Sequence, residues 1–121
     1  MARHNELGKL GEEAAKQYLL SQGYAILQTN FRVGRKEADI IAYQDGVIVF
    51  VEVKTRSSDE IVAPESAVDR SKQQSYVRLA NAYVLQNHRE EEVRFDIIAI
   101  LVNDMDDVKI KHIPNAFTTI G

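Results

Sequence analysis

The chain has 121 residues, a hydrophobic content of 45% and a formal net charge of −3. This length suits a single core, so we expect residues 1–121 to form one domain. The chain contains no cysteine, which excludes disulfides and thiolate metal sites. The negative charge argues against nucleic-acid binding through the overall field of the protein, because domains that bind in that way are usually basic.

No segment resembles a signal peptide or a membrane span. The N-terminal residues lack an uninterrupted apolar core, and no run approaches the roughly 18 apolar residues that a span requires. We therefore expect a soluble protein without a membrane partner. The absence of cysteine is consistent with the reducing cytoplasm.

Two helices and five strands are predicted in the order αβββαββ. A first amphipathic helix begins with Asn5 as its N-cap and ends before Gly23. Three short strands rich in branched and aromatic residues follow, at residues 24–29, 37–43 and 47–54. Pro64 and residues 66–69 resemble the capped start of a second helix, which ends near Gln86. Strands at residues 93–102 and 108–113 complete a mixed sheet with helices on its faces.

The dipeptide Asp45-Gly46 predicts a tight hairpin between the second and third strands, since both central positions of such a turn need positive φ. This turn sets a register in which Asp39 faces Glu52 and Glu37 faces Lys54. All these charged side chains then share one face of the hairpin. The opposite face is wholly apolar and consists of Ala38, Ile40, Ala42, Val47, Val49, Val51 and Val53.

Facing carboxylates predict a metal site. Directly opposed Cβ atoms lie roughly 5 Å apart, and two ionised carboxylates at that distance repel by about 3 kcal/mol. Three carboxylates and one ammonium leave the patch at about −2, which one divalent ion balances. Oxygen ligands favour Mg²⁺ or Mn²⁺, and His4, His88 and His112 lie far apart in the sequence. The alternative is an ordinary strand end where Glu37 and Lys54 form an ion pair.

An aspartate, a hairpin and then Glu-x-Lys at the end of the next strand resemble the core of the PD-(D/E)xK nucleases. Nearly the whole chain also resembles the YraN family of small bacterial proteins, which is similar in turn to archaeal Holliday-junction resolvases. The family often has Gly-Glu-Ile-Asp, whereas here Gly34 lies two residues further from Glu37 and Asp39. The family resemblance rests on Gly11-Glu12, Gly23-Tyr24, Asn30-Phe31-Arg32, Glu37-Ala38-Asp39, Phe50-Val51-Glu52-Val53-Lys54-Thr55-Arg56, Pro64-Glu65-Ser66-Ala67-Val68, Lys72, Arg94-Phe95-Asp96 and Asn115-Ala116-Phe117.

The resemblance implies a restriction-endonuclease-like fold and a metal-dependent endonuclease that hydrolyses phosphodiester bonds in DNA, with branched or abnormal DNA as the expected substrate. Asp39, Glu52 and the carbonyl of Val53 would hold Mg²⁺ or Mn²⁺. Lys54 would orient the attacking water or stabilise the developing negative charge. Its alternative role is to pair with Glu37. Cutting a symmetric junction would need two sites and hence a homodimer.

Other charged residues each have two interpretations. Glu12, at the edge of the first helix's apolar stripe, either joins the outer shell of the metal or is an ordinary acid favoured by the helix dipole. Glu37 is either an outer-shell acid or an ion-pair partner. Lys72, within the second helix's apolar stripe, either meets a phosphate or extends to solvent. The cations expected to contact a DNA backbone around the acids, each of which can also be a plain surface charge, are Arg32, Arg35, Lys36 and Arg56.

Two other function classes fit the sequence. One is a DNA- or RNA-binding module that keeps the nuclease fold without cutting, and the other is a protein-interaction factor whose acidic cluster recruits a basic partner. No motif that reads bases is present. Arg94 and Asp96 are expected to pair with each other, and Tyr18, Tyr76 and Tyr83 are expected in the core.

Overall fold

The computed structural model describes residues 2–57, 68–104 and 107–118. Within these residues it contains two helices and a five-stranded mixed sheet in the predicted order αβββαββ. No helix among them is long and apolar enough to cross a membrane. The elements are α1 (Ala2–Ser21), β1 (Ala25–Val33), β2 (Lys36–Gln44), β3 (Val47–Ser57), α2 (Arg70–Gln86), β4 (Glu92–Asp104) and β5 (Asp107–Phe117).

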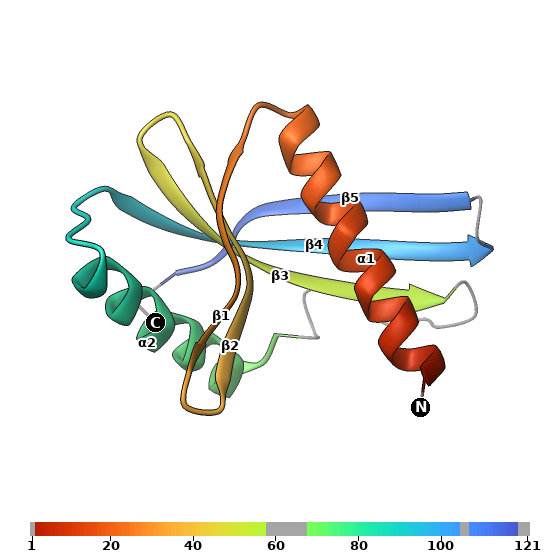
Figure 1. The fold of residues 1–121 in the computed structure, drawn as a ribbon, viewed down its shortest axis with the longest axis horizontal. Helices are drawn as coiled ribbons and strands as arrows, with labels where there is room; N and C mark the ends of the chain where they lie inside the picture. Colours follow the sequence, from red (N-terminus) through yellow and green to blue (C-terminus); the bar gives the residue numbers. More distant parts are fainter. Residues whose placement is uncertain (1, 58–67, 105–106, 119–121) are drawn as a thin grey trace.

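The strands lie in the order β1-β2-β3-β4-β5, and the two helices cover opposite faces of the sheet (Figure 1). Neighbouring strands are antiparallel except β3 and β4, which are parallel and connected through α2. Side chains of β3 alternate between two buried clusters. Ile48 and Phe50 pack with α2, while Val49 and Val51 pack with α1. Burial on both faces explains the unbroken apolar run at the start of β3.

The hairpin of β2 and β3 has the predicted register, but only over part of its length. Pairing runs from Gln44 opposite Val47 to Ile40 opposite Val51, and both turn residues have positive φ, 51° for Asp45 and 82° for Gly46. The ladder then ends, and the β1–β2 hairpin and β3 separate (Figure 1). The predicted ladder pairs Asp39 with Glu52 and Glu37 with Lys54 are therefore wrong.

The separation of the strands also changes which face Ala38 occupies. Ala38 packs in the cluster under α2 together with Phe31, whereas Ile40 packs in the cluster under α1. The prediction that Ala38 shares an apolar face with Ile40 is therefore wrong. Ala38 lies opposite Phe31 in the β1–β2 ladder, beyond the point where β2 stops pairing with β3.

Element boundaries differ from the predictions at several ends. Helix α1 begins at Ala2, so Asn5 lies inside the helix and is not its N-cap. Helix α2 begins at Arg70, and its N-cap Asp69 accepts a hydrogen bond from the backbone N–H of Lys72 at 2.9 Å. Pro64 and residues 66–67 of the predicted start lie outside the described residues. A tight turn at Gly34 lengthens β1 and β2, and β4 and β5 also extend beyond their predicted ends.

Gly11 allows α1 to lie directly on β3. A Cβ at this position would lie 1.8 Å from Oγ1 of Thr55, so Gly11→Ala is expected to lower the free energy of unfolding by about 1–3 kcal/mol through overpacking. Gly8 lies in the same helix, and a Cβ there would meet nothing within 4 Å. Gly8→Ala is the matched control and is expected to raise the free energy of unfolding by about 1 kcal/mol. Urea denaturation measures both, and equal effects would contradict the close approach.

Candidate functional site

Asp39 and Glu52 lie where β2 and β3 separate. The Oδ2 atom of Asp39 accepts a hydrogen bond from the backbone N–H of Val53 at 2.8 Å. This carboxylate thus takes the place of the backbone carbonyl that a continuous ladder would supply. In an extended strand the N–H and C=O of one residue face the same neighbour, so the carbonyl of Val53 also faces the gap.

Asp39 is in an environment that disfavours its charge. Burial raises the pKa of Asp39 to about 8, and repulsion from the nearby Glu52 carboxylate adds to the rise. Glu12 contributes a further, smaller repulsion, while the hydrogen bond from Val53 acts in the opposite direction. Without a bound cation, Asp39 therefore holds a proton near neutral pH.

Glu52 is a buried acid, with 3% of its surface exposed. Its Oε1 atom accepts a hydrogen bond from the Tyr76 hydroxyl at 2.6 Å. Its Oε2 atom lies 3.3 Å from Nζ of Lys54 and 3.4 Å from Nζ of Lys72. A buried carboxylate needs such partners, because an unpaired buried charge is strongly unfavourable. Glu52 is thus held by groups from both β3 and α2.

Lys72 points toward Glu52. The sequence alone did not decide whether this side chain turns toward the site or extends to solvent. Tyr76 was expected in the core, and it is 1% exposed, but its hydroxyl also belongs to the site. The same hydroxyl accepts the backbone N–H of Asp39 at 3.5 Å, and burial together with the charges of Asp39 and Glu52 raises the pKa of Tyr76 well above its ordinary value. The signal in the sequence was the i, i+4 spacing, which puts Tyr76 beside Lys72 on one helix face.

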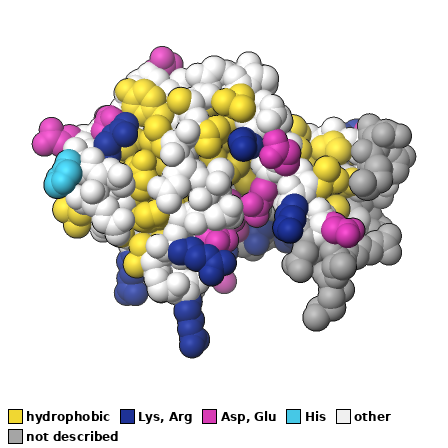
Figure 2. Space-filling view, viewed as in Figure 1, with side chains coloured by type: hydrophobic (Ala, Val, Ile, Leu, Met, Phe, Trp, Pro, Cys, Tyr) yellow, Lys and Arg dark blue, Asp and Glu magenta, His cyan; other side chains and the backbone are white. Residues whose placement is uncertain are grey.

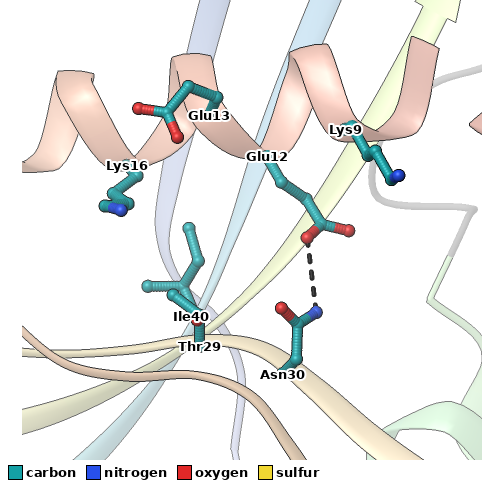
Figure 3. Close-up of a pocket in the computed structure, with 7 residues that line it drawn as sticks. All are labelled: Lys9, Glu12, Glu13, Lys16, Thr29, Asn30 and Ile40. Atoms are coloured by element: carbon teal, nitrogen blue, oxygen red, sulfur yellow. Dashed lines mark hydrogen bonds between the residues drawn. The ribbon is translucent and has the colours of Figure 1, made fainter. Parts of the chain in front are cut away.

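Glu12 reaches the site from the other side of the sheet. Its Oε1 atom accepts a hydrogen bond from Nδ2 of Asn30 at 3.3 Å, across a pocket between α1 and β1 (Figure 3). The pocket has a volume of about 220 Å³. Glu12 is close enough to Asp39 to act on its pKa, as an outer-shell acid would. The residues that line the pocket are Lys9, Glu12, Glu13, Lys16, Thr29, Asn30 and Ile40.

Glu37 is paired with an arginine of the neighbouring strand. It lies opposite Arg32 in the β1–β2 ladder and forms an ion pair with it, with Oε2 2.8 Å from the arginine Nε. Lys54 pairs with Glu52 instead, so the alternative ion pair of Glu37 with Lys54 is not the one that forms. Arg32 and Arg35 are exposed on the β1–β2 hairpin, Lys36 is partly exposed there, and Arg56 is partly exposed on β3.

The charge balance at the acids differs from the predicted surplus of about −2. Glu37 is paired elsewhere and Lys72 adds a second cation. No group of three His, Cys, Asp or Glu residues suited to a metal occurs among the described residues. Mg²⁺ is commonly bound by only one or two carboxylates, with water completing its shell. The Asp39 and Glu52 carboxylates, beside a carbonyl that faces the same gap, fit such an ion.

A second polar cluster lies on the α1 face of the sheet. Asp96 is fully buried and accepts two hydrogen bonds from Arg94, at 2.8 and 2.9 Å, so the predicted pairing is confirmed. Asp96 Oδ2 lies 2.7 Å from Nε2 of His112, and Oδ1 accepts the backbone N–H of Asn115 at 2.9 Å. Although burial acts to raise it, the contacts with His112 and Arg94 hold the pKa of Asp96 below its ordinary value. This cluster fastens β5 to β4.

Known proteins are similar in sequence to this chain over nearly its whole length. A model described as "Uncharacterised protein family UPF0102" matches residues 11–100. The chain is 44% identical over 117 residues to UPF0102 protein FP2501 of Flavobacterium psychrophilum, covering 97% of this chain and 98% of the relative. It is 49% identical over 112 residues to UPF0102 protein THEYE_A1950 of Thermodesulfovibrio yellowstonii, covering 93% and 96%. A UPF0102 protein of Bacteroides thetaiotaomicron is 46% identical over 117 residues, with 97% and 96% covered.

Proposed function

The chain belongs to the UPF0102 family, whose description names no activity, and we propose from its site geometry that it is a metal-dependent DNA endonuclease. One observation carries the proposal. The carboxylates of Asp39 and Glu52 lie near each other where β2 and β3 separate, and Lys54 forms an ion pair with Glu52. An aspartate before a hairpin and Glu-x-Lys after it also resemble the PD-(D/E)xK core. The order αβββαββ supports the same relationship.

Asp39, Glu52 and the carbonyl of Val53 are the groups that would hold Mg²⁺ or Mn²⁺. The ion would lower the pKa of a water molecule and neutralise charge on the phosphate. Asp39 would lose its proton on holding such an ion, because a carboxylate ligand must be ionised. Tyr76 fixes one oxygen of Glu52 through its hydroxyl, and so keeps the carboxylate orientation constant.

Lys54 and Lys72 would stabilise negative charge on the phosphate during hydrolysis. In hydrolysis the water oxygen bonds to phosphorus and loses a proton to solvent, the bond from phosphorus to the departing sugar oxygen breaks, and that oxygen gains a proton from solvent. Lys54 and Lys72 each place an ammonium beside Oε2 of Glu52, where negative charge develops on the phosphate. Lys72 can move toward a bound phosphate, since 41% of its side chain is exposed. Glu12 stays in the outer shell, across the pocket from Asn30.

The expected substrate is branched or otherwise abnormal DNA. The support for it is the resemblance to archaeal Holliday-junction resolvases, whose early helical Glu, Asp and Glu-x-Lys occur in the same order as Glu12, Asp39, Glu52 and Lys54. A symmetric junction requires two cuts, so this substrate implies a homodimer. The cations that would contact the DNA backbone lie on the β1–β2 hairpin and on β3, and they are Arg32, Arg35, Lys36 and Arg56.

A second function is favoured by one observation. Glu52 already has Tyr76, Lys54 and Lys72 as partners without any metal. Because these partners already compensate the negative charge of Glu52, the site also suits a non-catalytic nucleic-acid-binding protein that retains the nuclease fold. In that case DNA binding would persist, without cutting, after removal of both acids.

Cleavage should require Glu52 and a divalent ion. Linear, nicked, flapped and four-way DNA are incubated with the protein in Mg²⁺, in Mn²⁺ or in chelator. We expect Glu52→Gln to lower the cleavage rate by at least about a hundredfold, because it removes a charged ligand while keeping the side-chain shape. Asp45→Asn is the matched control, since Asp45 lies in the turn at the other end of the same hairpin.

The control should cleave as the wild type does, and chelator should stop both. Cleavage by Glu52→Gln at the wild-type rate would identify a contaminating nuclease and refute the assignment. Binding without cleavage by the wild type on every DNA would favour the non-catalytic function instead.

A further inference from the structure

Asn30 has a backbone conformation that is rare within a strand. Its φ is 52°, in the left-handed region that residues other than glycine seldom adopt and that asparagine tolerates better than most. In the β1–β2 ladder, the residues on either side of Asn30 pair with the residues on either side of Asp39. A local distortion of the edge strand β1 therefore lies directly across from a carboxylate of the proposed active site.

The left-handed backbone turns the side chain of Asn30 toward α1. Consecutive side chains of a regular strand point to opposite faces of the sheet. Thr29 and Asn30 are consecutive, yet both line the pocket between α1 and β1. The amide of Asn30 points from β1 toward Glu12 of α1, and its Nδ2 donates a hydrogen bond to Oε1 of Glu12 at 3.3 Å (Figure 3).

This amide, and not an ion pair, holds the carboxylate of Glu12. Acidic and basic side chains are mixed on the face of the molecule that carries α1 (Figure 2), and Lys9 and Lys16 line the same pocket as Glu12. Among the residues that the structure describes, neither lysine forms an ion pair with Glu12. The close approach of α1 to β3 at Gly11 fixes the backbone of the helix above the sheet. The direction of the Glu12 carboxylate then depends on Asn30.

We propose that Asn30 is a positioning residue, whose amide directs the Glu12 carboxylate toward the ion that Asp39 and Glu52 would hold. The assignment rests on the proposed function, in which Glu12 acts from the outer shell. Glu12 is near enough to Asp39 to raise the pKa of that residue. Groups that orient a metal site from outside its ligands commonly change metal affinity by about 10- to 100-fold when they are removed.

Asn30→Gly separates the role of the amide from that of the backbone, because glycine adopts positive φ readily and has no side chain. Mn²⁺ affinity is measured by titration calorimetry without DNA, and urea denaturation verifies the fold of each variant. We expect Asn30→Gly and Glu12→Ala each to bind Mn²⁺ about tenfold more weakly than the wild type. The double variant should bind no more weakly than Glu12→Ala, because the amide has nothing to direct once that carboxylate is gone.

Asn103→Gly is the matched control. Asn103 likewise donates its amide to a carboxylate in an exposed position, with Nδ2 2.7 Å from Oδ2 of Asp107. It lies about 20 Å along β4 from Ile97, the residue that pairs with Glu52. This variant should bind Mn²⁺ as the wild type does.

The outcomes separate this inference from the proposed function. Wild-type Mn²⁺ affinity in Asn30→Gly, in a protein whose wild type cleaves DNA, would overturn the positioning role and leave the endonuclease intact. A further loss of affinity when Asn30→Gly is added to Glu12→Ala would also overturn the role, because the amide would then act on another group. The expected coupling in a protein whose wild type cleaves no DNA would support the positioning role and overturn the endonuclease. A wild type that binds no Mn²⁺ would overturn both.

Discussion

Asp39→Asn is expected to stabilise the metal-free protein at pH 8 while abolishing DNA cleavage. Burial and the charge of Glu52 raise the pKa of Asp39 to about 8, so ionisation of this residue opposes folding. Asparagine keeps an oxygen that can accept the N–H of Val53 and has no charge to desolvate. The expected gain in the free energy of unfolding at pH 8 is on the order of 3 kcal/mol, which allows for the partial exposure of Asp39.

The gain should depend on pH in a defined direction. Between the ordinary aspartate pKa near 4 and the folded value of about 8, the folded state binds more protons than the unfolded state. The stability of the wild type relative to Asp39→Asn should therefore fall as pH rises through this range and level off above pH 8. Urea denaturation in chelator from pH 4 to pH 9 measures the difference.

Asp45→Asn makes the same chemical change in the turn of the hairpin and is the matched control. A wild type that gains stability over Asp39→Asn with rising pH would contradict the assigned environment. Added Mn²⁺ should restore the stability of the wild type but not that of Asp39→Asn, because binding to the folded state stabilises it.

Asp96→Ala is expected to lower the free energy of unfolding by about 3–5 kcal/mol, because it removes one partner from a buried ion pair. The variant would leave Arg94 and His112 without their shared carboxylate, and the backbone N–H of Asn115 without an acceptor. Glu91→Ala is the matched control, because Glu91 also accepts hydrogen bonds from an arginine two residues away, Arg89, but has 27% of its side chain exposed where Asp96 has none. Ion pairs that solvent reaches stabilise proteins less than buried ones lose when they are broken.

Thermal and urea denaturation of the two variants measure this contrast. The pKa of Asp96 is lowered in the folded protein, so its contribution is present above pH 4 and is lost in acid. The difference between the wild type and Asp96→Ala should therefore narrow below pH 4. Equal destabilisation by Asp96→Ala and Glu91→Ala would show that burial of Asp96 does not decide its contribution.

The sequence predicted the fold well because its strongest signals are local. Asp45-Gly46 predicts a tight turn. The turn sets the observed cross-strand pairs, which begin with Gln44 opposite Val47 and end with Ile40 opposite Val51. The separation of β2 from β3 could not be predicted in this way, since it depends on how β2 also pairs with β1. Glu37 illustrates the consequence, because Gly34 and the following residue form a second turn that places Glu37 opposite Arg32.

The candidate site was predicted in part. Asp39, Glu52 and Lys54 come from one hairpin, so the tight turn already predicted that they lie near one another, although the ladder pair of Asp39 with Glu52 does not form. Tyr76 and Lys72 come from α2, and only the packing of that helix on the sheet brings them to Glu52. An aromatic residue on an apolar stripe predicts core packing, and the sequence does not reveal that a hydroxyl at the end of its ring meets a carboxylate.

The hydrogen bond from Val53 to Asp39 also affects how the sequence of a relative without nuclease activity would be interpreted. Wherever these two strands part, the N–H at position 53 needs an acceptor, so selection for folding alone would retain aspartate or asparagine at position 39. Among the residues that the structure describes, Glu52 accepts its hydrogen bond from the side chain of Tyr76 and none from a backbone group. Apolar replacement of a buried ion pair is often neutral or stabilising. Position 52, rather than position 39, is thus the one whose identity would separate members that cut from members that have only kept the fold.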